Sequence, residues 1–193
     1  MIMPCVPEVH SWRVGQIFLG AMTALLLMLA GCDMPVRDEP EVVEETAETT
    51  LAPEVEPNGR IIEVRMYTID PDDPTRQHVF KPELITAEVG DTIRFIPTEQ
   101  SHQSSSVATM LPEGARGWEG VVNEEVSYVL PKPGIYGFEC VPHYAAGMTG
   151  LVVVEGEGKT DNLAQARETP HPGLATPRFA ALFAKAEAEG LFD

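Results

Sequence analysis

The sequence predicts an all-β fold, a sandwich or barrel of short strands, followed by two short α-helices. Between residues 60 and 155, short β-branched and apolar segments alternate with turns rich in glycine and proline, a pattern typical of antiparallel sandwiches. The sequence shows no alternation of strands with long helices, no glycine-rich phosphate loop and no internal repeat. These observations argue against a parallel α/β fold and a nucleotide-binding domain.

Six strands are expected, each bounded by turn residues. Gly90 and Asp91 form a turn before one of them, and the run from Pro131 to Gly134 separates two others. Such residues favour turns because they tolerate unusual backbone angles or fix them. The expected strands cover residues 61–69, 84–89, 92–96, 126–130, 135–140 and 151–154.

The C-terminal segment, residues 156–193, is rich in alanine and has a helical pattern over residues 161–168 and 177–189. Pro177 suits a first helical turn, and Gly190 suits the position just past a last turn. Phe179, Leu182 and Phe183 recur at the spacing of one helix face. We therefore expect these helices to pack on the sandwich as an extension of the domain formed by residues 60–155.

Acidic residues dominate the chain, which carries 13 basic and 30 acidic side chains and a net charge of −17. No segment is basic, which argues against nucleic acid as a partner. Residues 33–59 combine acids with proline and threonine and have no aromatic residue. Such a composition cannot bury enough apolar surface to order itself, so this stretch is expected to be a disordered acidic linker.

Residues 1–32 have the pattern of an export signal. Arg13 precedes a long apolar run that ends Leu29-Ala30-Gly31-Cys32, which resembles the lipobox of bacterial lipoproteins. Cys32 is then the lipidated first residue of the mature chain, held on the periplasmic side of a bacterial membrane. Two alternatives remain: an uncleaved membrane anchor, and a cleaved signal that leaves the protein soluble in the periplasm. The three cysteines lie in different settings, and no disulfide is expected.

The segment from Cys140 to Met148 carries the chemistry. It places Cys140, His143 and Met148 in one loop between two expected strands, and His102 follows an earlier strand. Two imidazoles and a thiolate with a weak axial thioether form the blue-copper electron-transfer site, which suits both Cu(I) and Cu(II). Zinc is the rival metal, but the methionine favours copper. The other histidines, His10, His78 in a turn-rich loop and His171 between prolines, are expected to be structural or exposed.

At these residues the chain resembles the pseudoazurins, members of the cupredoxin family, from residue 60 to about residue 190. The resemblance implies an eight-stranded Greek-key β-sandwich with one type 1 copper at one end, held by His102, Cys140, His143 and Met148. It also implies that the edge of His143 reaches an apolar surface where electrons enter and leave. The matching stretches are Phe80-Lys81-Pro82, Gly90-Asp91-Thr92, Phe95-Ile96-Pro97-Thr98, Met110-Leu111-Pro112-Glu113-Gly114-Ala115, Cys140-Val141-Pro142-His143-Tyr144 and Gly147-Met148.

Two residues beside the ligands, Gln103 and Pro142, are expected to affect the hydrogen bonding of the Cys140 sulfur and so the reduction potential. By the resemblance, the backbone N–H of Gln103 donates to the Cys140 sulfur, although the family usually has asparagine at this position. Pro142 has no N–H, so a second hydrogen bond to the sulfur is expected to be absent, which keeps the reduction potential lower. Pro142→Ala is then expected to raise the potential, and voltammetry would show it.

The function expected from this site is one-electron transfer between respiratory redox proteins that dock near His143, with no small-molecule substrate. A copper enzyme is disfavoured, because multicopper sites need further histidines and the chain has only five. The alternative is a periplasmic protein that stores or delivers copper. Pseudoazurins tend to ring their contact surface with lysines, whereas residues 60–155 carry only Lys81 and Lys132, so the family's usual acidic partner is not carried over.

Overall fold

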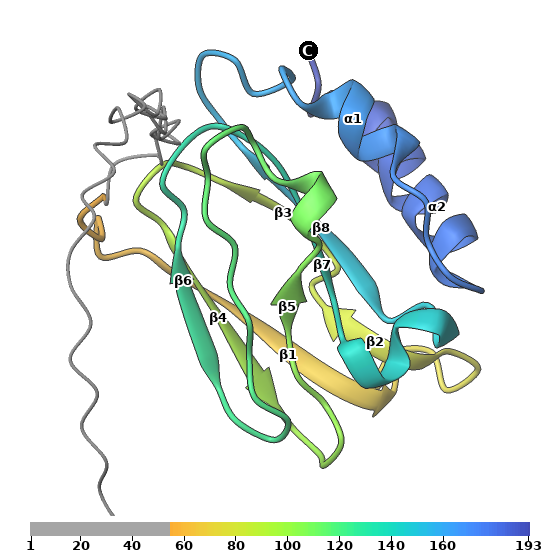
Figure 1. Ribbon diagram of the computed structural model, residues 1–193. Helices are drawn as coiled ribbons and strands as arrows, with labels where there is room; N and C mark the ends of the chain where they lie inside the picture. The colour runs from red at the N-terminus through yellow and green to blue at the C-terminus, as the bar shows by residue number, and fades with distance from the viewer. Residues whose placement is uncertain (1–54) are drawn as a thin grey trace, which may run out of the picture. The chain divides into compact units, whose positions relative to one another are not determined.

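The computed structural model describes residues 55–193 (Figure 1). The expected signal segment with Cys32, and most of the expected linker, lie outside the described residues. Within residues 55–193, no helix has both the length and the apolarity needed to cross a bilayer.

Eight strands form two four-stranded sheets (Figure 1). One sheet has the order β2-β1-β4-β6 and the other β3-β8-β7-β5. The pairs β1–β4 and β3–β8 are parallel, and the remaining pairs are antiparallel. The prediction of an all-β sandwich is confirmed. The strands are β1 (Ile61–Ile69), β2 (Gln77–Lys81), β3 (Leu84–Ala87), β4 (Thr92–Pro97), β5 (Ser105–Ser106), β6 (Val126–Val129), β7 (Gly134–Glu139) and β8 (Thr149–Val154).

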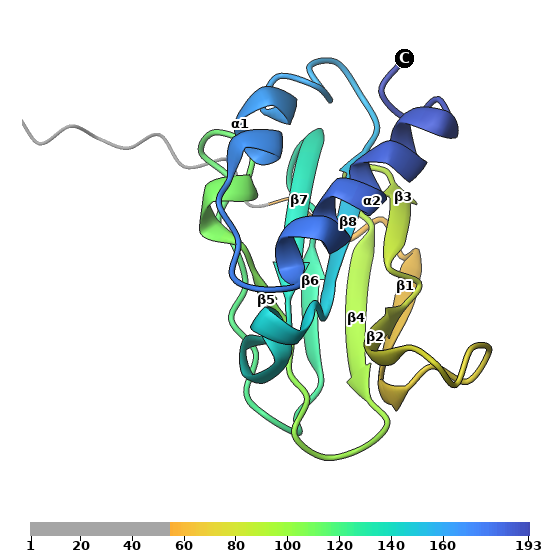
Figure 2. The same ribbon diagram turned by 90° about the vertical axis from the view of Figure 1, so that its right-hand side faces the viewer.

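The two helices, α1 (Leu163–Glu168) and α2 (Ala175–Ala188), cover the outer face of the second sheet (Figure 2). Their bounds differ from the expected ones by one or two residues, as is usual at helix ends. Gly190 follows α2 with a φ of 71°, the left-handed conformation that commonly ends a helix. The apolar face predicted for this segment is therefore the face that packs.

Burial patterns along the strands follow from this three-layer arrangement. In β1, the buried residues Val64 and Met66 alternate with more exposed neighbours, because only one face of that sheet is covered. In β8 all six residues are buried, since the other sheet covers one of its faces and the helices cover the opposite one. The continuous apolar run in the sequence is thus explained by burial on both faces.

One apolar cluster lies on each face of the second sheet. The cluster between the sheets contains packed aromatic rings, with those of Phe95 and Phe138 5.1 Å apart and Trp118 stacked on Phe95 at 5.3 Å. The cluster under the helices joins Phe179 and Leu182 to residues of β7 and β8. Each large side chain buried in this way contributes roughly 1.5–3 kcal/mol.

Two strands were not predicted from the sequence. β5 has only two residues, both serine, and β2 has polar residues at three of its five positions. The expectation that His78 lies in a turn-rich loop is wrong, because His78 is the second residue of β2. Its φ of 52° is unusual for a residue with a side chain.

Candidate metal centre

The four predicted ligand residues come together at one end of the sandwich. His102 lies in the loop after β4, Cys140 directly follows β7, and Met148 directly precedes β8. His143 lies in the short 3-10 helix η2 (Val141–Ala146) that connects β7 to β8. Three of the four therefore come from one connection between two paired strands.

Backbone hydrogen bonds fold this connection into a closed loop. The N–H of Cys140 donates to the carbonyl of Met148 at 3.1 Å, and the N–H of Met148 donates to the carbonyl of His143 at 3.2 Å. Gly147 ends the short helix with a φ of 90°, a left-handed conformation that favours glycine. Cys140 and Met148 are thereby held opposite each other before any metal binds.

The distances between the donor atoms fit a shared metal ion. Cys140 Sγ lies 3.5 Å from Nδ1 of His143 and 4.0 Å from Nδ1 of His102. A sulfur bonded to an ion at about 2.3 Å and a nitrogen bonded to the same ion at about 2.0 Å, at a trigonal angle, are about 3.7 Å apart. Met148 is fully buried in the same apolar cluster as Cys140. The arrangement suits one ion with a thiolate, two imidazoles and a nearby thioether.

The Cys140 thiol is fully buried, and this burial raises its pKa. Hydrogen bonding from the backbone N–H groups of Gln103 and His143 acts in the opposite direction and lowers the pKa. The N–H of Gln103 was expected at the sulfur, and no second donor was expected because Pro142 has no N–H. The second expectation is corrected: the N–H of His143, which donates to the carbonyl of Cys140 at 2.9 Å, also acts on the sulfur and lowers the pKa of the thiol. Because a metal binds the thiolate, metal binding at this site must release the thiol proton.

His102 is fixed from both ends of its side chain. Its Nε2 lies 3.0 Å from the hydroxyl of Thr68, near the end of β1, and its Nδ1 faces Cys140. Its carbonyl accepts a hydrogen bond from the N–H of Asn123 at 2.8 Å. With Nδ1 free to bind a metal, Nε2 carries the proton and donates to Thr68. Burial lowers the pKa of His102, which keeps the imidazole neutral, as a ligand must be.

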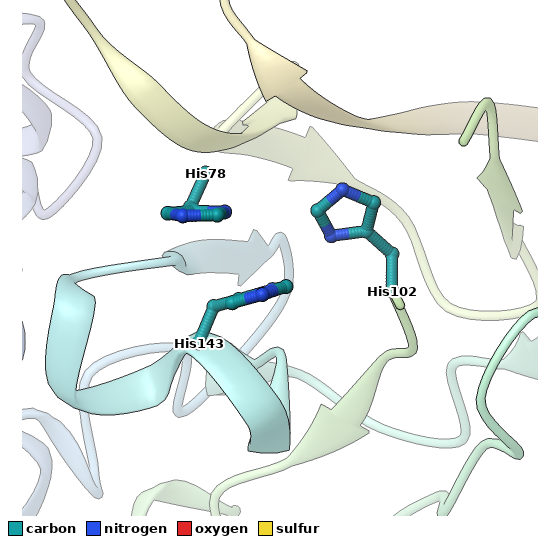
Figure 3. A group of neighbouring side chains, drawn as sticks. All are labelled: His78, His102 and His143. Atoms are coloured by element: carbon teal, nitrogen blue, oxygen red, sulfur yellow. The ribbon is translucent and has the colours of Figure 1, made fainter. Parts of the chain in front are cut away.

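A third imidazole, that of His78, lies beside the predicted ligands (Figure 3). Its ring stacks on the ring of His143 with centroids 4.0 Å apart and planes 16° apart. A nitrogen lone pair lies in the plane of its ring. An ion in the plane of His143 would therefore lie well out of the parallel plane of His78. In this arrangement His78 covers a ligand ring and is not itself a ligand.

His78 was expected to be a structural or exposed residue with no part in the site, and the structure instead packs its ring against a predicted ligand. Its Nδ1 atom is buried without a hydrogen-bond partner, and its ring centroid lies 6.2 Å from that of His102. The sequence offered no local sign of this contact, because His78 precedes His143 by 65 positions and comes from the other sheet.

The C-terminal segment also contacts the ligand loop. The hydroxyl of Tyr144 lies 2.6 Å from Nδ1 of His171, and the N–H of Leu174 donates to the carbonyl of Ala145 at 2.9 Å. Burial raises the pKa of Tyr144 to about 12 and lowers the pKa of His171. A neutral His171 therefore accepts the hydrogen bond of the neutral tyrosine. This contact braces the loop from the side of α2.

The comparisons with known proteins agree with this geometry. Residues 73–155 match the family model of copper binding proteins of the plastocyanin/azurin family. The pseudoazurin of Methylorubrum extorquens is 40% identical over 112 residues, which cover 58% of this chain and 74% of the relative. The chain belongs to the pseudoazurin family. The pseudoazurin of Paracoccus pantotrophus is 38% identical over 107 residues, or 55% of this chain and 72% of that pseudoazurin.

A solved pseudoazurin structure gives the same result for the fold. The pseudoazurin of Hyphomicrobium denitrificans superposes with a TM-score of 0.59 at 36% identity, over 65% of this chain and 97% of the other. Pseudoazurins are blue-copper electron-transfer proteins, and the cofactor of this chain is accordingly one type 1 copper. The donor set described above fits that cofactor.

Proposed function

We propose that this chain is a blue-copper electron shuttle in which His102, Cys140, His143 and Met148 hold the copper. The observation that carries the proposal is the approach of two imidazole nitrogens to one buried thiol, at 3.5 and 4.0 Å. Bound copper supplies a one-electron couple, and the mixed soft and borderline ligands suit both of its oxidation states.

The surroundings of the ligands favour electron transfer because they restrict rearrangement. Thr68 and Asn123 fix His102, and the ligand loop is closed by its own hydrogen bonds. Ligands that are held in place move little when charge arrives or leaves, and a small movement keeps the barrier to electron transfer low. The chain's own contribution is thus rigidity and exclusion of water.

We propose that electrons pass through the partly exposed ring of His143. Its neighbours Val141, Pro142, Ala145 and Ala146 are exposed and apolar, so a redox protein can approach the ring across a surface that sheds water easily. The proposed partners are redox proteins that dock here, one as donor and one as acceptor.

We also propose that the mature chain is tethered through a lipid on Cys32 and faces the periplasm. The support is the sequence Leu29-Ala30-Gly31-Cys32 at the end of an apolar run. Labelling with a radioactive fatty acid in a bacterial host tests this. The wild-type chain is expected to incorporate the label and to sediment with membranes, and Cys32→Ser is expected to do neither.

The metal site is tested by optical and EPR spectra of the chain carrying Cys32→Ser and loaded with Cu(II). We expect an intense visible sulfur-to-copper band and a narrow copper hyperfine splitting, both lost in Cys140→Ser. A weak band with the wide splitting of tetragonal copper would remove Cys140 from the ligand set and with it the shuttle. Rapid loss of copper to an apo acceptor protein would favour copper delivery instead.

A further inference from the structure

We infer that the copper end of this chain docks on a redox protein whose own contact surface is positively charged. The inference rests on the proposed function, since it names the class of partner for the same site. It is supported by the acidic charge of the loops around the ligands and by the ion pairs that neutralise Lys81 and Arg76.

The three loops that carry the proposed ligands or hold them in place contain acidic residues and no basic ones. These loops are residues 97–103, 119–125 and 139–148, and their charged side chains are Glu99, Glu119, Glu124, Glu125 and Glu139. All but Glu139 are exposed. A partner that approaches the site therefore meets carboxylates first.

Two contacts place these carboxylates close to the ligand His102. Glu99 Oε2 accepts a hydrogen bond from the N–H of Thr68 at 3.1 Å, and the hydroxyl of Thr68 contacts His102. Asn123, whose N–H bonds the carbonyl of His102, is followed directly by Glu124 and Glu125. We call Glu99, Glu124 and Glu125 the acidic rim.

Two basic residues, Lys81 in β2 and Arg76 just before it, are already paired with carboxylates. Lys81 Nζ lies 2.5 Å from carboxylate oxygens of both Asp70 and Asp72. Arg76 pairs with Asp70 at 3.3 Å and with Glu83 at 2.6 Å. The carboxylates in these ion pairs neutralise the charges of Lys81 and Arg76. The connection that contains Asp70 and Asp72 therefore adds no net positive charge near the site.

Apolar side chains are exposed on the loops that carry the site and against them. Val121 and Val122 are 59% and 42% exposed, and they directly precede Asn123. Val141, which lies in the ligand loop, is 54% exposed, and Leu174, whose N–H donates to Ala145 of that loop, is 63% exposed. An apolar centre with charge at its margin is the usual composition of a transient interface, in which charge steers the approach and apolar contact excludes water.

Charge decides between the possible occupants of this surface. A second copy of the chain would bring its own acidic rim against this one, and an anionic lipid surface would repel both the rim and the rest of a chain of charge −17. A redox protein with lysines around its exposed cofactor edge meets attraction instead. We assign the surface to such a partner.

The first test uses small oxidants of opposite charge on the reduced, copper-loaded chain carrying Cys32→Ser. Stopped-flow rates are measured with cationic tris(1,10-phenanthroline)cobalt(III) and with anionic hexacyanoferrate(III), at ionic strengths from about 0.01 to 0.5 M, where screening becomes strong. We expect the rate with the cation to fall several-fold as salt rises, and the rate with the anion to rise. Equal responses to salt would overturn the inference.

The second test uses matched charge variants. Glu99→Gln, Glu124→Gln and Glu125→Gln together remove the acidic rim, and the glutamine at 99 can still accept from Thr68. The control combines Glu113→Gln, Glu157→Gln and Asp161→Asn, which line a hollow beside Lys132 at the opposite end of β7. Both variants change the net charge by the same amount, so any difference between them reports the position of the charge.

The partner used for these variants is a cytochrome c of high isoelectric point, with the same cytochrome after succinylation of its lysines as the acidic comparison. At low salt we expect the rim variant to react with the basic cytochrome roughly 5–10-fold more slowly than wild type, and the control variant to change less than about 2-fold. Equal losses in the two variants, or a faster reaction with the succinylated cytochrome, would overturn the inference. A missing visible copper band would instead show that the proposed function itself has failed.

Discussion

The ring of His78 stacks on the ring of His143, with centroids 4.0 Å apart and planes 16° apart. His143 is the ligand through which we propose that electrons pass, so its accessible part is its edge, while one face is covered by a second imidazole. The stack also joins β2 of the first sheet to the loop that closes the second sheet.

Removal of this stacked ring is expected to change the reduction potential. In His78→Ala, water reaches the face of His143 and stabilises the more highly charged oxidised site, so the potential falls. A stacked aromatic pair contributes about 0.5–1.5 kcal/mol of interaction free energy. For a one-electron couple, this limits the change in reduction potential to on the order of 60 mV. Voltammetry measures it, and His78→Phe, which retains a ring, is the control. Identical potentials in the alanine and phenylalanine variants would show that the stack has no such role.

The hydroxyl of Thr68 is expected to contribute to copper affinity. Thr68→Val keeps the shape of the side chain but removes the acceptor for Nε2 of His102. Removing a hydrogen-bond partner that orients a metal-bound histidine typically lowers the metal affinity 10–100-fold. We therefore expect Thr68→Val to lower the copper affinity about 10-fold, measured by competition titration with a copper chelator. Thr68→Ser should bind like wild type. An unchanged affinity in the valine variant would mean that the backbone alone positions His102.

The contact between Tyr144 and His171 is expected to make stability depend on pH. Burial lowers the pKa of His171 below its ordinary value near 6.5, so the unfolded chain binds more protons below that pH. The stabilisation is complete above about pH 6.5 and is lost as the pH falls below it. We expect the copper-loaded wild type to lose more stability between about pH 7.5 and 5 than His171→Gln, which cannot titrate there. Urea unfolding at both pH values measures the difference, and parallel losses would contradict the role of His171.

Asn162 is expected to be a strong anchor for the C-terminal segment. Its side chain accepts from the N–H of Ile135 at 2.9 Å and donates to the carbonyl of the same residue at 2.8 Å, within the buried interior. Asn162→Ala leaves two buried backbone groups unpaired, at a cost of roughly 2–4 kcal/mol in the free energy of unfolding. Gln165→Ala, which removes one exposed hydrogen bond to Thr109, should cost under about 1 kcal/mol. A similar cost for the two variants would show that water replaces Asn162.

The part of the site that lies in one loop could be predicted from the sequence. Cys140, His143 and Met148 are close in sequence, and their residue types alone point to copper. The strands with β-branched runs were predicted for the same reason, since their pattern is local. His102 was added because it follows a predicted strand.

The supporting contacts could not be predicted, because they join residues distant in sequence. Thr68 precedes His102 by 34 positions, and neither its type nor its neighbours signal a role. His78 lies in a strand of mixed polarity whose pairing with β1 depends on tertiary structure rather than on propensity. Of the two backbone donors near Cys140, that of Gln103 was expected from the family resemblance, whereas that of His143 arises from loop geometry, which no residue type specifies.

The helices carry no proposed ligand, yet because they cover the outer face of the second sheet they require apolar residues at the positions that face them. Ile135, Leu151 and Val153 point toward Phe179 and Leu182 of α2, and all five are buried. A relative that lacks the C-terminal helices would expose the first three positions to water, and we expect polar residues there in any such protein. These three positions, rather than the ligands, should therefore reveal from a sequence alone whether a copper domain of this kind has helices on its outer face.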